Sequence, residues 1–421
     1  MGRFVFYNPH GYWYKRTAYA HFHPQLPTYK KYQWIWDYFY KKDKYIYVYI
    51  NDYETTLQGS GRKNFWKWAL LNGINPLKVK LIPTIKDLNP TDIVFLFQLG
   101  NLNLQYDPFL PPVKNIEELA SCRAYKVMHL THYGYHGKIA AQYTKSAKID
   151  LFIAESNLAK HSKIFQYYYP WYARDVFVLP FIIENRFRYL QHYDKRKNKA
   201  VATGQVLYAP NNLYEDFGIK YLHPMRKLIL DNDEKLSSII DSHIIKYNPK
   251  SEYSSPNNKK TFFHLLVQKT LTSQKTYCIR FFFKMLLAYA KLLRTQKIKA
   301  YDYDIVALLN QYKMVVHGKE CMDLPPISAF EGMACGCALI SEQDGFYEDL
   351  GFEEGVSYIA TDGTLADLKN KIEFFRNRPD LLEQIAENGR KKTLEINSCD
   401  YMANLITYCT HEILKKNENN F

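Results

Sequence analysis

Short apolar segments alternate with helix-like segments along the first half of the chain, and this alternation constrains the fold more than any other feature. The strand-like segments are Phe4–Tyr7, Tyr45–Ile50, Ile93–Phe97, Lys126–Leu130, Leu151–Ala154 and Val176–Leu179. They are rich in β-branched or aromatic residues and end at turn residues, and segments such as 63–71 and 158–168 between them have helical character. Such an alternation predicts an α/β fold with parallel sheets covered by helices on both faces.

The length of the chain, 421 residues, predicts two domains, because single cores stop growing well below this size. We expect a first Rossmann-like domain at 1–187 and a second at 199–395, joined by a charged linker at 193–198. The second would begin with the strand Ala200–Gly204 and contain an irregular, polar insertion near 211–275. Further on, a helix is expected to begin near Pro379 and to end at Gly389.

The segment 330–341 combines a carboxylate, a run of small residues, a glycine and a short apolar strand. A helix that begins between Ser328 and Glu331 would direct its free N–H groups and its positive dipole end toward a bound diphosphate. Glu331, expected in the first turn, could accept hydrogen bonds from a ribose diol. Asp323 lies eight positions earlier, after the strand-like segment 314–317.

This pattern resembles the nucleotide-sugar site of retaining family 4 glycosyltransferases, which have the GT-B fold. The resemblance implies two Rossmann-like domains that face a central cleft, with 396–421 as a final helix that packs back on the first domain. It also implies a hexosyl- or related glycosyltransferase that moves a sugar from a nucleotide-diphosphate donor to a hydroxyl. Glu331 and Gly332 would bind the donor, and Asp323, an Asp where the family has Glu, would be catalytic. Glu320 is the alternative acid.

His132 is the second candidate catalytic residue. It follows a strand-like segment, at the edge where open α/β sheets bind ligands, and it resembles a histidine that family 4 enzymes carry near the donor sugar. A zinc site formed with His129 and His136 is an alternative, although a strand followed by a glycine gives the three side chains no common face. A purely structural histidine is the third possibility.

The residues that would bind the donor phosphates are less clearly marked. In the family an Arg and a Lys follow the first strand of the second domain, but here Gly204 precedes Gln205. Arg226 is the nearest candidate because a guanidinium suits a bidentate diphosphate contact, although a solvated helix face explains it equally well. The loop Gly59–Lys63 is a weaker anion-binding candidate.

Metal-independent activity is expected, with the nucleotide sugar as co-substrate and no cofactor. The resemblance implies that basic side chains and a helix N-terminus stabilise the leaving diphosphate. Asp302 and Asp304 form an Asp-x-Asp pattern, but they precede a helix-like segment, and helix capping by Asp304 is the stronger interpretation.

The net charge of +14 predicts that the surface attracts anions. We expect a cytoplasmic protein, peripheral at the inner face of an anionic membrane, with a glycan or lipid-linked acceptor in surface polysaccharide or glycoconjugate synthesis. No signal peptide is visible, and Arg280, Lys284 and Lys291 interrupt the most apolar long segment. A non-catalytic nucleotide-sugar-binding protein is the alternative. A basic nucleic-acid-binding protein is less favoured because Lys and Tyr are spread along the chain, so no nucleic-acid partner is expected.

Overall fold

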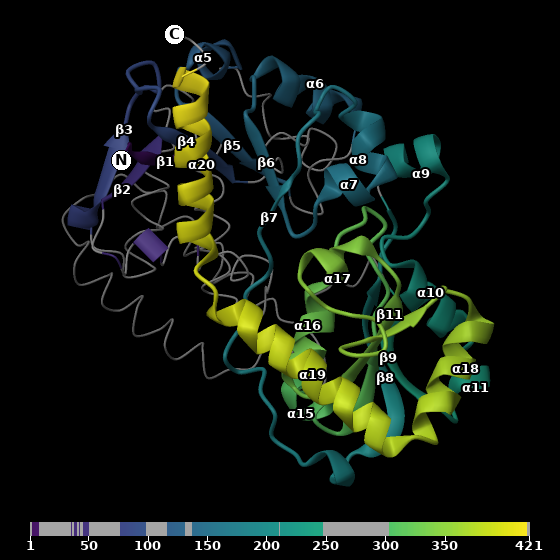
Figure 1. Cartoon of the computed structure of the whole chain (residues 1–421). Coiled ribbons are helices and arrows are strands. Elements are labelled where there is room, and N and C mark those ends of the chain that lie inside the picture. Colours follow the sequence, from purple (N-terminus) through teal and green to yellow (C-terminus); the bar gives the residue numbers. More distant parts are fainter. Residues whose placement is uncertain are drawn as a thin grey trace, which may run out of the picture.

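A computed structural model gives the architecture of the chain. It describes residues 2–7, 35, 38, 39, 42, 45–49, 76–97, 116–130, 137–209, 211–246 and 303–418. Two parallel sheets, one in each half of the chain, organise these residues (Figure 1). The expected α/β fold with two Rossmann-like units is therefore confirmed.

The first sheet contains seven described strands, all parallel, in the order β3-β2-β1-β4-β5-β6-β7. Their bounds are β1 Phe4–Tyr7, β2 Ile46–Tyr49, β3 Val79–Ile82, β4 Ile93–Phe97, β5 Tyr125–His129, β6 Leu151–Ala154 and β7 Phe177–Val178. Strands β1, β5 and β6 are buried along their whole length, as parallel strands covered on both faces must be. The order matches the Rossmann arrangement.

Short helices follow the strands of the first domain. Their bounds are η1 Pro76–Lys78, α5 Ile116–Ser121, α6 Lys138–Ser146, α7 Leu158–His161 and α8 Lys163–Tyr168. Helix α8 begins at an N-cap serine, Ser162, whose hydroxyl accepts a hydrogen bond from the Phe165 N–H. A stacked aromatic pair, Phe165 and Tyr169, then fixes this helix against β6 with ring centroids 4.7 Å apart.

The second sheet contains five described strands, also all parallel, in the order β12-β11-β10-β8-β9. Their bounds are β8 Lys197–Val206, β9 Ile240–Lys246, β10 Tyr312–Val316, β11 Ala338–Glu342 and β12 Ile359–Thr361. Counted along the chain, this is the order 2-1-3-4-5 of flavodoxin-like sheets, in which the chain changes direction between its first and third strands. Strands β8 and β10 flank that switch point.

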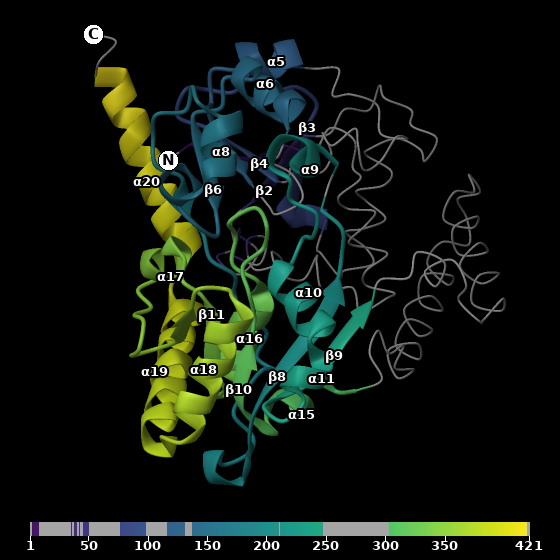
Figure 2. The ribbon, with the colours of Figure 1, turned by 90° about the vertical axis from the view of Figure 1, so that its right-hand side faces the viewer.

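Helices cover both faces of this second sheet (Figure 2). The helices of this part of the chain are η3 Tyr193–Lys195, α9 Asn211–Phe217, α10 Pro224–Asp231, α11 Asp233–Leu236, α15 Ile305–Leu309, α16 Ile327–Ala334, α17 Gly345–Asp349 and α18 Leu365–Arg376. Helix α9 is the exception to this covering, because it packs against α8 of the first domain, where the Tyr168 hydroxyl donates to Asp216 Oδ2 at 2.7 Å. The expected irregular insertion near 211–275 is therefore regular in its first part, where α9, α10, α11 and β9 occupy residues 211–246. The segment expected as a linker already contains η3 and the start of β8.

The chain ends in two long helices, α19 Pro379–Ser398 and α20 Tyr401–Glu418. Helix α19 continues nine residues past Gly389, so the prediction that this glycine ends it is wrong. A Cβ at Gly389 would lie 2.5 Å from the Ser357 carbonyl oxygen, and the glycine therefore serves close packing. Helix α20 lies along the first domain, where Glu412 pairs with Arg174 and Lys416 pairs with Asp150 (Figure 1).

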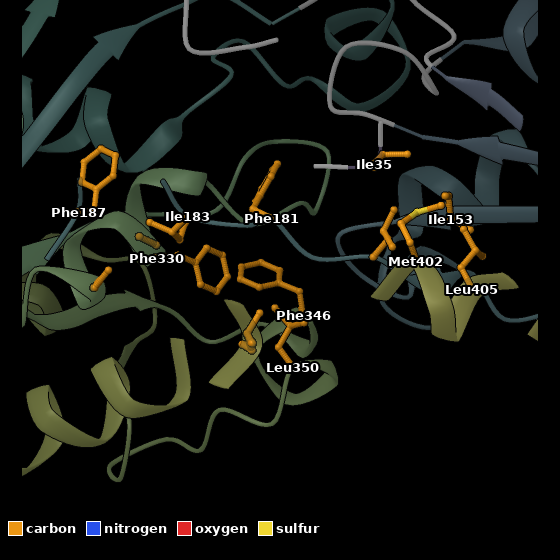
Figure 3. Close-up of a cluster of buried hydrophobic side chains, with 14 of the residues drawn as sticks. Ile35, Ile153, Phe181, Ile183, Phe187, Phe330, Phe346, Leu350, Met402 and Leu405 are labelled. Carbon is orange, nitrogen blue, oxygen red and sulfur yellow. The ribbon is translucent and has the colours of Figure 1, made fainter. Parts of the chain in front are cut away.

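The two domains share one hydrophobic cluster. The connecting segment 181–187 contributes Phe181, Ile183 and Phe187, and the second domain contributes Phe330 and Phe346 (Figure 3). Asn397 at the end of α19 accepts a hydrogen bond of 2.9 Å from the Ile183 N–H. Because burial of these side chains is shared, the domains meet through a continuous apolar core.

Candidate functional site

The carboxyl edge of the second sheet gathers polar groups at its switch point. Gly204 lies in β8, two residues before this strand ends at Val206, and β10 ends directly before His317. Open α/β sheets bind ligands at this edge, outside the carboxyl ends of the strands where the strand order reverses. The structure therefore places the predicted Gly204 and the start of α16 at the expected position for a ligand.

Arg226 lies directly over Gly204. The glycine adopts a φ of 114°, and a Cβ there would lie 2.6 Å from the Arg226 Cζ atom. The guanidinium Nη1 donates a hydrogen bond of 3.3 Å to the Gln205 carbonyl oxygen. Proline at the first position of α10 holds the arginine near the start of that helix. Two residues that the sequence analysis selected separately are thus in contact.

His317 faces the same region from the end of β10. Its Nδ1 lies 3.2 Å from the Ser328 hydroxyl oxygen in the first turn of α16. Among the described residues its buried Nε2 has no hydrogen-bond partner. Burial, and then the Arg226 charge, lower the pKa of His317 to about 3, so the ring is neutral near pH 7. A neutral imidazole can present one N–H to a ligand without adding a charge.

Helix α16 carries the motif that the sequence analysis emphasised. It begins at Ile327 after Pro326, which provides no side-chain cap, so the first backbone N–H groups have no side-chain acceptor there. Glu331 is half-buried and lies in the second turn rather than the first. Gly332 faces the sheet, where a Cβ would lie 2.7 Å from Val315 Cγ1. This glycine therefore allows close packing between helix and strand, and its predicted donor-binding role stays a prediction.

Asp323 lies at the junction of the two domains. Its Oδ2 accepts a hydrogen bond of 2.8 Å from the Ser162 hydroxyl in the first domain, and its Oδ1 lies 3.3 Å from the Lys319 ammonium nitrogen. The residue has a φ of 56°, in the left-handed region that non-glycine residues seldom adopt. Such strain concentrates at functional sites because the surrounding contacts must hold it.

Lys319 connects Asp323 with two further carboxylates. Its ammonium nitrogen lies 3.0 Å from Asp344 Oδ2, and its backbone N–H donates a hydrogen bond of 2.8 Å to Glu342 Oε2. Burial opposes the charge of Lys319, but Asp344 and Asp323 outweigh it and raise its pKa. Burial raises the pKa of Glu342 and of Asp344. The loop after β10 is thus held by one cation among three carboxylates.

The other predicted residues are distributed as follows. His132, His136 and the loop Gly59–Lys63 lie outside the described residues. His129 ends β5 with its Nε2 3.6 Å from Glu155 Oε1, and no group of three potential metal ligands occurs in the described part of the chain. Asp304 caps α15 by accepting from the Val306 and Ala307 N–H groups, which agrees with the capping interpretation. The predicted roles of Asp323, His132, Glu331, Gly332, Arg226 and Gly204 remain predictions.

Three side chains at this edge were missed by the sequence analysis. His317 directly follows a buried strand and Lys319 lies two residues further on, and this position could have identified them. Ser162 has no comparable signal, because it reaches Asp323 across 161 positions of sequence.

No described helix combines the length and the apolar composition needed to cross a bilayer.

Parts of this chain are similar in sequence or in structure to known proteins. Residues 287–407 match the family model described as glycosyl transferase-like. No curated protein matches the chain. Similar solved structures include HepE from Anabaena in complex with UDP-glucose, with 12% identity over 100% of both chains and a TM-score of 0.46. A glycosyltransferase from Rickettsia africae has 14% identity over 98% of this chain and 99% of that chain, with a TM-score of 0.47.

TarM has 12% identity over 79% of this chain and 55% of that chain, with a TM-score of 0.39. The family match spans α16, Glu331 and Asp323, the residues on which the resemblance was based. Together with the two parallel sheets, it confirms the prediction of a glycosyltransferase of the GT-B type. Residues 287–407 of this chain are therefore similar to the glycosyl transferase-like family, within a fold of two Rossmann-like domains.

Proposed function

We propose that this chain transfers a sugar from a nucleoside-diphosphate donor to a hydroxyl of a glycan or lipid-linked acceptor, with retention of configuration. The observation that carries the proposal is the convergence of Arg226, Gly204 and the uncapped start of α16 at the switch point of the second sheet. A diphosphate is the ligand that suits a guanidinium beside free helix N–H groups.

Each group has a distinct part in this proposal. Arg226 and the α16 N-terminus stabilise the diphosphate, whose negative charge grows as the bond to the sugar breaks. Glu331 accepts hydrogen bonds from the ribose. Asp323 stands at the sugar end of the donor, in the strained turn between the domains. These contacts supply charge stabilisation without a metal ion, so the proposed reaction is metal-independent.

Donor binding can be tested by thermal unfolding in the presence of UDP-, GDP-, CMP- and TDP-sugars. A ligand that binds only the folded protein adds about 2.7 kcal/mol of stability at about a hundred times its dissociation constant. We expect one of the three nucleoside-diphosphate classes to raise the melting temperature, and the CMP-sugar, which has a single phosphate, to have no comparable effect. Absence of any shift with all four classes would contradict the proposal.

Glu331→Gln isolates the ribose contact. Loss of a charged hydrogen-bond acceptor costs about 1.5–3 kcal/mol, which corresponds to about ten- to a hundred-fold weaker donor binding. Glu387→Gln is the matched control, because Glu387 lies exposed on α19 and pairs only locally with Lys391. If Glu331→Gln and Glu387→Gln bind the donor equally well, Glu331 does not contact the donor.

The acceptor is proposed to be acidic or membrane-linked because the chain carries a net charge of +14. In this proposal the protein works in surface polysaccharide or glycoconjugate synthesis, on the cytoplasmic side of an anionic membrane. Sedimentation with vesicles that contain phosphatidylserine should show binding that weakens as salt rises. Equal recovery with neutral and anionic vesicles at low salt would favour a soluble acceptor.

A non-catalytic nucleotide-sugar-binding protein is the second candidate. One observation favours it: both carboxylate oxygens of Asp323 already have protein partners, Ser162 and Lys319. Donor binding without turnover across a broad panel of acceptors would support this alternative.

A further inference from the structure

Ser162 forms a bridge between the two domains at the candidate catalytic acid. It is fully buried, and it caps α8 by accepting a hydrogen bond of 3.1 Å from the Phe165 N–H. Its own O–H donates to Asp323 Oδ2 at 2.8 Å. One hydroxyl therefore fixes both the start of a helix in the first domain and a carboxylate in the second.

The turn that carries Asp323 is held firmly on its own side. The Asp323 N–H donates to the Glu320 carbonyl oxygen at 3.0 Å, and the Glu320 N–H donates to the Leu324 carbonyl oxygen at 3.1 Å. The Cys321 N–H reaches the Leu222 carbonyl oxygen at 2.8 Å. These bonds maintain the left-handed backbone at Asp323, and this backbone directs the side chain toward Ser162.

Neighbouring contacts bring Ser162 to a defined position. Asp349, at the end of α17, accepts from the Asn157 N–H at 2.8 Å and lies 2.9 Å from His161 Nε2. The His161 ring packs so closely on Gly345 that a Cβ there would lie 2.0 Å from Nδ1. Residues 157–162 therefore rest on α17, and Ser162 reaches Asp323 only when the domains meet in this way.

We propose that Ser162 is a positioning residue that orients the Asp323 carboxylate for sugar transfer when the two domains are in contact. The inference rests on the proposed function, in which Asp323 stands at the sugar end of the donor. Ser162 itself keeps its proton and touches no substrate. Its hydrogen bond and the Lys319 ion pair hold the two carboxylate oxygens from opposite domains, so the acid is correctly oriented only in the assembled site.

Two substitutions separate this role from helix capping. Ser162→Ala removes both the cap and the bond to Asp323. Ser162→Gly also removes the hydroxyl, but it preserves most of the cap, since glycine is nearly as good an N-cap as threonine. Ser162→Thr retains a hydroxyl and is the conservative rescue.

Thr364→Ala is the matched control for a lost cap. Thr364 caps α18 by accepting from the Asp367 N–H at 3.2 Å, and among the described contacts the only other partner of its hydroxyl is Asp362 Oδ1 at 2.7 Å. A general loss of stability from an uncapped helix should therefore occur in this variant without any effect on Asp323.

Steady-state kinetics of these variants, measured with the donor that most raises the melting temperature, give the decisive comparison. We expect Ser162→Ala and Ser162→Gly to lower kcat about ten- to a hundred-fold with the donor KM within about twofold of the wild type. Ser162→Thr should recover most of kcat, and Thr364→Ala should keep it. Adding Ser162→Ala to Asp323→Ala should cause little further loss, because both changes remove one coupled function.

An unchanged kcat in Ser162→Ala and Ser162→Gly would overturn the inference, and so would an equal loss in Thr364→Ala. These results in an active enzyme would leave the proposed function intact. A wild-type protein that binds donor but transfers no sugar would instead overturn the proposed function, and the inference with it.

Discussion

Replacement of His317 by asparagine should make the stability of the second domain less sensitive to acid. The histidine is buried, and its pKa of about 3 lies below the ordinary value of 6.5. The unfolded chain therefore binds a proton between these two pH values while the folded chain does not. His317 therefore leaves the unfolding free energy unchanged above about pH 6.5. Below that pH it lowers the unfolding free energy progressively, until about pH 3.

The magnitude follows from proton linkage. With these two pKa values, the wild type should lose about 1.4 kcal/mol between about pH 7.5 and about pH 5.5 through this group alone, and about 2.7 kcal/mol by about pH 4.5. Asparagine can keep the hydrogen bond to Ser328, because its amide group lies near the position of Nδ1. The substitution also leaves a cavity, but its cost is the same at every pH and does not change the pH dependence of the unfolding free energy.

Urea unfolding of both proteins across this pH range measures the effect. The difference in unfolding free energy between wild type and His317→Asn should shift in favour of the variant by about these amounts as the pH falls. A difference that stays constant from about pH 7.5 to about pH 4.5 would refute the reasoning, because it would mean that His317 ionises as freely in the folded protein as in the unfolded chain.

Three further predictions concern the site and its supports. Arg226→Ala should weaken donor binding by about 1.5–3 kcal/mol in calorimetry. Lys227→Ala, which removes an exposed ion pair with Asp231, should leave donor binding unchanged. Equal losses of affinity in the two variants would mean that the arginine acts only through the overall positive charge. Glycosyl transfer should survive EDTA, and loss of activity that manganese or magnesium restores would contradict the metal-independent mechanism. Gly345→Ala should destabilise the protein by about 1–3 kcal/mol in thermal unfolding, because its Cβ would overlap the His161 ring. The double variant with His161→Ala should lose less than the sum of the two single changes, and strict additivity would argue against the close contact.

The strands of the first sheet were predictable where burial on both faces produces uninterrupted apolar runs. Strand β3 was missed because Lys80 interrupts it and one of its faces is partly exposed. Strand β9 was missed for a similar reason: it lies at the edge of the described sheet, and Asp241, Ser242 and His243 give it a polar sequence. Edge strands tolerate polar residues, so hydrophobic pattern alone does not identify them.

One glycine gave a misleading signal. Gly389 suggested a helix end, yet α19 continues past it and the glycine is required by close packing against the Ser357 carbonyl, just as Gly332 packs closely on the Val315 side chain. Such contacts form between segments that are distant in sequence, and a sequence window does not contain them. Gly204 was different, because its place at the end of a predicted strand already indicated a ligand edge.

The candidate site was predictable only in its local part. Glu331, Asp323 and the start of α16 lie within one short stretch whose spacing resembles a known pattern. Ser162 and Lys319 act on Asp323 through the tertiary fold, one from the other domain and one through a strained turn. The Ser162 contact leaves no mark on the local sequence, whereas the position of Lys319 shortly after a buried strand could have identified it.

Product analysis of the complete reaction tests the central claim most directly. The donor that stabilises the protein in thermal unfolding would be incubated with enzyme and candidate acceptors, and the reaction would be followed by NMR. The account predicts that nucleoside diphosphate appears in equal amount with a new glycoside, whose anomeric configuration is that of the donor. A donor that binds tightly but yields neither product with any acceptor would contradict the account, as would a product of inverted configuration for the retaining mechanism.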